Sequence, residues 1–173
     1  MTITVPRVGM VLLIGASSSG KSTFARRHFK PTEIVSSDAL RALVADSESS
    51  MRASRDAFEL LHAIAMARLR HHRLTVIDAT NVRADARRAL IDIARSADVP
   101  VTAIVFALPE ATLMERTRER TDRRVPEATI RAQHRALTSA LPLLVDEGYR
   151  TVVVLRSDVE VEELVVTRSA ADR

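Results

Sequence analysis

Residues 15–23, GASSSGKST, follow an apolar run at residues 9–14 and fit the phosphate-binding pattern G-x-x-x-x-G-K-[ST], the P-loop. Small residues and two glycines after a strand let the backbone curl, so that successive N–H groups point at phosphate oxygens. Lys21 is then placed to reach the β- and γ-phosphates, and the Ser22 hydroxyl to ligate Mg²⁺. The residues that we assign to nucleotide binding are Gly15, Ser17, Ser18, Ser19, Gly20, Lys21, Ser22 and Thr23. The pattern predicts a site for ATP or another nucleoside triphosphate with Mg²⁺.

A second group of reactive side chains lies at residues 36–41, SSDALR, just after a short β-rich run. If that strand ends at Ser36 or Ser37, Asp38 lies at the carboxyl edge of the sheet, where ligands bind in open α/β folds. We interpret Asp38 as a general base for an attacking hydroxyl, and Arg41, one helical turn further on, as a phosphate clamp. The alternative is that Asp38 only caps the helix at residues 39–44 and that Arg41 is a solvated helix residue.

An acidic residue also ends the apolar run at residues 74–78. Asp78 at this position suits a Walker-B-like role, in which the carboxylate holds Mg²⁺ through a water molecule. Equally, Asp78, Thr80 and Asn81 can form a polar turn that caps the next helix. The sequence leaves both interpretations open.

The most basic stretch, ERTRERTDRR at residues 115–124, contains five arginines. Arg116, Arg120 and Arg123 recur at intervals of four and three residues, which predicts one stripe along a helix, with Arg118 on another side. Such a stripe can neutralise the charge that develops during phosphoryl transfer and exclude water. We therefore interpret residues 108–125 as a mobile lid, whereas the alternative is a solvated face in which Glu115, Glu119 and Asp122 are ion-pair partners.

Five β-rich runs alternate with helical patterns along the chain, at residues 9–14, 33–36, 74–78, 101–107 and 151–155. Strands separated by amphipathic helices predict an α/β fold with a parallel sheet covered on both faces. Numbering these five runs in order, we expect the strand order 2-3-1-4-5. The expected helices span residues 22–29, 39–44, 53–71 and 84–97, and Pro109 and Pro126 each open a further one. Residues 46–50 and 167–173 are candidates for flexible segments.

The composition limits the class of protein. With 173 residues, of which 46% are apolar, the chain is long enough for one well-buried core, and we expect a single domain at residues 1–173. We expect a cytoplasmic protein without a membrane partner, because the chain has no cysteine, no apolar run of about 18 residues and no signal-peptide pattern. The net charge is +4, and aromatic residues make up only 3%, which argues against a surface that stacks several bases.

Three stretches together resemble a known family. GASSSGKSTFARRHFKPTEIVSSDALR, LTVIDATNVRADARRALIDIA and ERTRERTDRRV are similar to the 5′-OH polynucleotide kinase domain of bacterial polynucleotide kinase-phosphatase, an RNA-repair enzyme. The resemblance covers nearly the whole chain. It implies transfer of the γ-phosphoryl group of a nucleoside triphosphate to the 5′-hydroxyl end of RNA or DNA.

The resemblance also bears on residues and partners. It supports Lys21, Asp38, Arg41, Arg116, Arg120 and Arg123 as catalytic residues, with Ser22 as a metal ligand. In that family, phosphatase and ligase domains follow the kinase in the same polypeptide, so we expect this chain to be an isolated kinase module or a stand-alone relative. A homodimer is left open.

Two other function classes fit the same motifs. A small-metabolite kinase of the gluconate- or shikimate-kinase type would use Arg41 to bind a substrate carboxylate. A nucleotide-dependent regulatory module would use the lid as a partner surface, and would bind or slowly hydrolyse nucleotide without a phosphoryl acceptor.

Overall fold

Strands and helices alternate along most of the chain in the computed structural model, which describes residues 1–120 and 125–169. The strands are β1 (Thr2–Val5), β2 (Met10–Gly15), β3 (Ile34–Ser36), β4 (Thr75–Asp78), β5 (Val101–Phe106), β6 (Thr151–Leu155) and β7 (Val165–Arg168). The α-helices are α1 (Lys21–His28), α2 (Ser37–Ala45), α3 (Ser54–Arg70), α4 (Ala84–Ser96), α5 (Glu110–Glu119), α6 (Glu127–Ala140) and α7 (Asp158–Glu163). Short 3₁₀ turns lie at η1 (Pro31–Glu33), η2 (Met51–Ala53) and η3 (Leu141–Asp146).

The central sheet has five parallel strands in the order β3-β4-β2-β5-β6. These are the five predicted strands in the predicted order, so the α/β fold class is confirmed. Every residue of the central strand β2 is buried, because helices cover both faces of the sheet. The register aligns Leu13 of β2 with Asp78 of β4, and Asp78 with Ser36 of β3, which brings three strand ends together at one edge.

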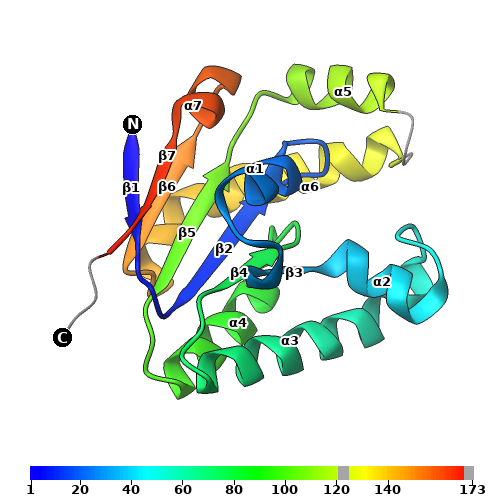
Figure 1. The fold of residues 1–173 in the computed structure, drawn as a ribbon. Coiled ribbons are helices and arrows are strands. Elements are labelled where there is room, and N and C mark those ends of the chain that lie inside the picture. Colours follow the sequence, from blue (N-terminus) through cyan, green and yellow to red (C-terminus); the bar gives the residue numbers. More distant parts are fainter. Residues whose placement is uncertain (121–124, 170–173) are drawn as a thin grey trace.

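Alternate residues of β2 pack into two different cores. Leu12 and Ile14 lie in a core with side chains of α3, α4 and α6, including Leu61 and Leu90. Val11 and Leu13 lie in a second core, which Phe24 of α1 completes. Figure 1 shows α3 and α4 running beside each other along the sheet. The two cores hold β2 in place, and with β2 the loop that follows it.

A second sheet joins the two ends of the described chain, and the sequence analysis missed it. In this sheet β1 and β7 pair in parallel, with Thr2 opposite Val165 and Val5 opposite Arg168 (Figure 1). The expectation of flexibility from residue 167 onward is therefore wrong for Thr167 and Arg168, which belong to β7. The signal was present in β1, where Ile3 and Val5 are buried and alternate with exposed threonines.

The helices near the strand ends begin where proline and serine place them. As predicted, α5 and α6 start directly after Pro109 and Pro126. The helix α7, which was not predicted, begins after Ser157, whose hydroxyl accepts a hydrogen bond from the Glu160 backbone N–H. Within residues 1–120 and 125–169, no helix is both long and apolar enough to cross a lipid bilayer.

Candidate active site

The P-loop connects the end of β2 to the start of α1, as predicted. A side chain on Gly15 would place its Cβ 2.9 Å from Ser19 Oγ and 3.0 Å from Phe106 Cβ, so only glycine lets the loop pass this close to β5. Gly20, the N-cap of α1, has a left-handed backbone with φ of 90°. The loop is therefore shaped by its two glycines, at the positions that the pattern requires.

The first turn of α1 has the properties of an anion site. No side chain caps this helix end, and the first turn contains no acidic residue. Lys21 is buried, and its Nζ donates hydrogen bonds to Ala16 O at 2.7 Å and to Ser19 Oγ at 3.2 Å. Ser22 is half-buried and Thr23 is exposed. A lysine held across a loop of backbone N–H groups fits a nucleoside triphosphate.

Asp78 lies at the carboxyl edge of the sheet and is buried. In the described residues, no group of three or more His, Asp or Glu side chains forms a metal site. A Mg²⁺ ion at this edge would have Ser22 and Asp78 as its protein side chains and phosphates and water as its other oxygen ligands, which is how Mg²⁺ is usually held beside nucleotides. The capping alternative for Asp78, Thr80 and Asn81 is wrong, because Arg83 is the N-cap of α4.

Asn81 links the turn after β4 to strand β2. Its Nδ2 donates a 2.8 Å hydrogen bond to Leu13 O of β2, and its backbone is left-handed with φ of 50°. Gly15 N donates to Thr80 O at 2.9 Å. The turn after β4 is thus bonded to the last residues of β2, directly below the P-loop.

Asp38 and Arg41 form an ion pair on α2. Ser36 is the N-cap of this helix and its Oγ accepts from Ala39 N, so the alternative of Asp38 as N-cap is wrong. Arg41 is only 5% exposed, so the solvated alternative is also wrong, and its Nε donates to Glu48 O at 2.8 Å. The pair brings a carboxylate and a guanidinium together at the end of β3, one helical turn apart as the spacing predicted.

Arg116 of α5 lies over the P-loop. Its Nη2 is 2.9 Å from Asp158 Oδ1 of α7, and its Nη1 would be 3.3 Å from a Cβ placed on Gly20. The fold therefore brings Arg116, one of the predicted lid arginines, to the start of α1.

The predicted arginine stripe does not continue along one helix. The helix α5 ends at Glu119, and Arg120 follows it with an extended backbone, φ −75° and ψ 122°. Arg118 points elsewhere, as predicted, and pairs with Glu127 of α6 at 3.2 Å. Arg123 and Arg124 lie outside the described residues. Because α5 ends before Arg120, helical spacing does not place Arg120 on the same face as Arg116. The roles of Arg120, Arg123 and Arg124 remain predictions.

Helices α5 and α6 contact the P-loop through residues that were not predicted as site residues. Ala16 packs in a small apolar core with Leu108, Leu113 and Met114 around α5, and with Ile130 of α6. The Gln133 side chain accepts a hydrogen bond from Ser17 N at 2.8 Å, and the hydroxyls of Thr117 and Ser18 lie 2.8 Å apart. No motif marks Gln133 or Thr117, because their importance comes from contacts across about a hundred residues of chain.

Family membership follows from a match that spans the site. The AAA_33 family model, described as an AAA domain, matches residues 10–140, from β2 through the P-loop and α5 to the end of α6. The chain belongs to the AAA_33 family. A comparison with curated proteins finds no match.

Solved structures place this AAA_33 domain among P-loop kinase-type folds. A chain of the Pnkp1/Rnl/Hen1 RNA repair complex is 26% identical, with a TM-score of 0.69 over 81% of this chain and 47% of that chain. This chain thus spans about half the length of that relative. A gluconokinase from Sinorhizobium meliloti 1021 is 19% identical, with a TM-score of 0.58 over 93% of this chain and 89% of that one. Kti12 from Chaetomium thermophilum, in complex with ADP-AlF3, is 18% identical, with a TM-score of 0.64 over 89% of this chain and 94% of that one. The last two show the fold alone.

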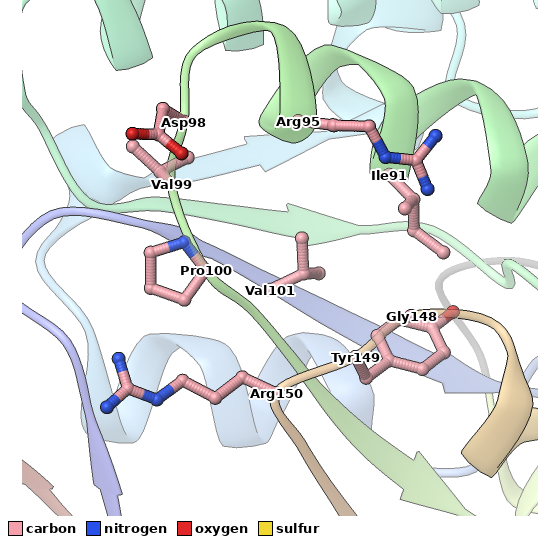
Figure 2. Close-up of a pocket in the computed structure, with 9 residues that line it drawn as sticks. All are labelled: Ile91, Arg95, Asp98, Val99, Pro100, Val101, Gly148, Tyr149 and Arg150. Carbon is pink, nitrogen blue, oxygen red and sulfur yellow. The ribbon is translucent and has the colours of Figure 1, made fainter.

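The AAA_33 domain also has a surface pocket of about 490 Å³ at the other edge of the sheet. Its lining residues come from the end of α4, the turn into β5 and the turn before β6 (Figure 2): Ile91, Arg95, Asp98, Val99, Pro100, Val101, Gly148, Tyr149 and Arg150. This is the amino edge of the parallel strands, whereas ligands of such sheets bind at the carboxyl edge. The pocket contains none of the predicted site residues.

Proposed function

We propose that this chain is a polynucleotide 5′-hydroxyl kinase, which transfers the γ-phosphoryl group of ATP or another nucleoside triphosphate to the 5′-hydroxyl end of RNA or DNA in nucleic-acid repair. The observation that carries the proposal is the Asp38–Arg41 ion pair at the end of β3, at the same edge of the sheet as the P-loop. Further support comes from the 26% identity to a chain of the Pnkp1/Rnl/Hen1 RNA repair complex.

The proposed reaction is an in-line displacement at the γ-phosphorus. The ion pair with Arg41 implies that Asp38 is a carboxylate, the form that can accept the proton of the 5′-hydroxyl. The hydroxyl oxygen then forms a bond to the γ-phosphorus as the bond to the bridging oxygen breaks, and ADP leaves. Lys21 and Arg116 contribute positive charge around the transferring group, as would Arg120 and Arg123. Arg41 would contact the phosphate that follows the acceptor nucleoside.

Ser22 and Asp78, the latter through water, would hold Mg²⁺. A bound Mg²⁺ ion supplies charge neutralisation at the phosphates. The P-loop side chains Ser17, Ser18, Ser19 and Thr23 surround the same phosphates in this proposal.

The proposal is tested by incubating the protein with γ-labelled ATP, Mg²⁺ and an oligonucleotide that carries a 5′-hydroxyl. The matched acceptor has the same sequence with a 5′-phosphate. We expect label on the 5′-hydroxyl strand only, and no label with the Lys21→Ala variant. Equal labelling of both strands, or none on either, contradicts the proposal. RNA and DNA versions of the acceptor test which nucleic acid is preferred.

A small-metabolite kinase is the second candidate, because the similarity to the gluconokinase extends over 93% of this chain and 89% of that one. In that case Arg41 would bind the carboxylate of a sugar acid. Acceptors that differ by one phosphate separate the candidates. A polynucleotide kinase prefers a nucleoside 3′-phosphate to the free nucleoside, whereas a gluconate-type kinase phosphorylates neither and labels gluconate.

We also propose that residues 1–173 form one kinase domain with residues 108–125 as its lid. In a longer parent protein, this domain would be linked to phosphatase and ligase domains. Light scattering of the purified chain tests whether it forms a homodimer.

A further inference from the structure

Two side chains, one on α5 and one on α6, contact consecutive residues of the P-loop. The Oε1 atom of Gln133 on α6 accepts a hydrogen bond from the Ser17 backbone N–H at 2.8 Å. The Thr117 hydroxyl on α5 lies 2.8 Å from the Ser18 hydroxyl. The loop that is predicted to bind phosphates is therefore held from outside at two adjacent positions.

The position of Gln133 on α6 is fixed by buried neighbours on the same helix face. Ile130, three residues earlier, is fully buried and packs against Ala16, and Leu137, four residues later, is also buried. These anchors direct Gln133 toward the loop. Gln133 is the only glutamine of the chain and Asn81 the only asparagine, and each carboxamide is bonded to backbone of β2 or the P-loop.

The backbone beside this contact needs support. Ser18 has φ of 64°, a left-handed conformation that is unfavourable for a residue with a side chain. A strained residue keeps such a conformation only where its surroundings hold it. The hydrogen bonds at Ser17 and Ser18 supply support of this kind.

We propose that Gln133 is a positioning residue of the nucleotide site, which holds the Ser17 N–H and so keeps the P-loop in the conformation that receives the β- and γ-phosphates. The inference rests on the part of the proposed function in which ATP binds the P-loop, and it does not depend on the acceptor. In the opposite model, Gln133 competes with the nucleotide, because it occupies the Ser17 N–H that a phosphate oxygen of ATP would otherwise accept from. The two models predict opposite changes in affinity when the carboxamide is removed.

The test compares the dissociation constants of ATP and AMP for the wild type and for Gln133→Leu, Gln133→Glu and Ser139→Ala, measured by competition against a fluorescent nucleotide. AMP lacks the β- and γ-phosphates, so a general loss of structure changes both constants, whereas a displaced P-loop changes mainly that of ATP. We expect Gln133→Leu to raise the Kd of ATP about three- to tenfold, as for one lost hydrogen bond, with a smaller change for AMP. Ser139 is exposed on the same helix, and its variant should match the wild type.

Gln133→Glu is the second arm, because its shape is nearly unchanged and it can still accept from Ser17 N–H. It places a negative charge beside the phosphates, so we expect weaker ATP binding that recovers in part as salt is raised. An unchanged or lower Kd of ATP for Gln133→Leu overturns the inference while leaving the proposed function in place. A wild type that does not bind ATP overturns both.

Discussion

Arg116 lies between Asp158 and Gly20, with its Nη2 atom 2.9 Å from the Asp158 carboxylate and its Nη1 atom 3.3 Å from where a Cβ on Gly20 would lie. The guanidinium therefore lies over the start of α1. Its tether comes from α7, an element at the far end of the chain from the P-loop. Asp158 thus controls the position of a residue that we place in the nucleotide site.

Replacing Asp158 with Asn should weaken ATP binding through Arg116. Both side chains are partly exposed, so the ion pair is worth at most about 1 kcal/mol and the expected rise in the KM of ATP is about two- to fivefold. Steady-state kinetics at low salt measure the KM of ATP for the variant and the wild type. The control is Glu162→Gln, on the exposed side of the same helix. An unchanged KM for Asp158→Asn would show that Arg116 does not need this tether.

Replacing Asp38 with Asn should remove the proton acceptor while keeping the shape of the side chain. We expect kcat for phosphoryl transfer to fall about 10²- to 10⁴-fold, the usual contribution of a general base. The Kd of ATP should change by less than about twofold, because the proposed mechanism places Asp38 beside the acceptor hydroxyl and not beside the nucleotide. Single-turnover transfer and nucleotide titration measure the two quantities. Asp46→Asn, in the exposed loop after α2, is the matched control, and a variant at Asp38 with a near-normal rate refutes the assignment.

The ion pair between the buried Arg87 and the half-buried Glu147 should contribute strongly to the stability of the region below the site. Arg87 is 1% exposed, its Nε and Nη2 atoms lie 2.7 and 2.5 Å from the Glu147 carboxylate, and its Nη1 donates to Asn81 O at 3.0 Å. Removing one partner leaves a buried charge, so Glu147→Ala should cost about 3–5 kcal/mol in the free energy of unfolding. Urea denaturation measures the loss.

A double variant separates the charge effect from packing. Arg87→Met combined with Glu147→Leu removes both charges, and it should recover most of the stability that Glu147→Ala loses. Glu163→Ala, an exposed acidic residue on α7, should leave the unfolding midpoint unchanged. If Glu147→Ala behaves like Glu163→Ala, the pair contributes little.

The Tyr149 hydroxyl should lose its proton at a higher pH than an ordinary tyrosine does. Burial raises its pKa above the ordinary value of 10.0, and the negative charge of Glu147, whose Oε2 lies 3.2 Å from the Tyr149 hydroxyl, raises it further. The folded state therefore keeps the proton after the unfolded state has lost it, so this contribution to stability is complete below about pH 10 and is lost as the pH rises above it.

Because the chain has one tyrosine, tyrosinate absorbance reports this residue alone. The folded protein, monitored by circular dichroism in the same samples, should show little tyrosinate until well above pH 10, whereas protein in urea should titrate near 10. Tyr149→Phe should lose less stability above pH 10 than the wild type. Titration of the folded protein near pH 10 would contradict the prediction.

The sheet could be predicted because its strands carry a local signal. The run at residues 9–14 is apolar without interruption, which is typical of a strand buried on both faces, and Pro100 marks the entry to the fourth run. The P-loop motif directly follows the run at residues 9–14, so this run was predicted to be the strand beside the phosphate-binding loop. A parallel α/β architecture alone allows more than one strand order, so the order 2-3-1-4-5 depended on interpreting the motif as that of a P-loop phosphotransferase.

The end of α5 could not be predicted in the same way. Residues 108–125 contain arginine and glutamate but no glycine and no proline after Pro109, so local preference favours a helix throughout. In the structure, Arg116 forms an ion pair with Asp158, and Arg118 forms one with Glu127. The helix ends at Glu119. Such tertiary contacts are not visible in the spacing of residues.

The same reason explains why Gln133 and Asp158 were missed. Each lies on a short stretch without a motif, and each matters only because the fold brings it beside the P-loop or Arg116. Asp38 and Arg41 were found because their partnership is local, three residues apart on one helix. Local pairs can be predicted from sequence spacing, whereas pairs between distant elements require the fold.

The pairing of β1 with β7 has a consequence for the order in which the protein assembles. The Thr4 and Thr167 hydroxyls lie 3.0 Å apart across a separation of 163 residues, and contacts of such long range form slowly. Synthesis proceeds from the amino terminus, so β1 leaves the ribosome long before residues 165–168 exist. Until then its backbone is an open edge that other chains can pair with. Among the strands that the structure describes, β1 therefore waits longest after its synthesis for its partner.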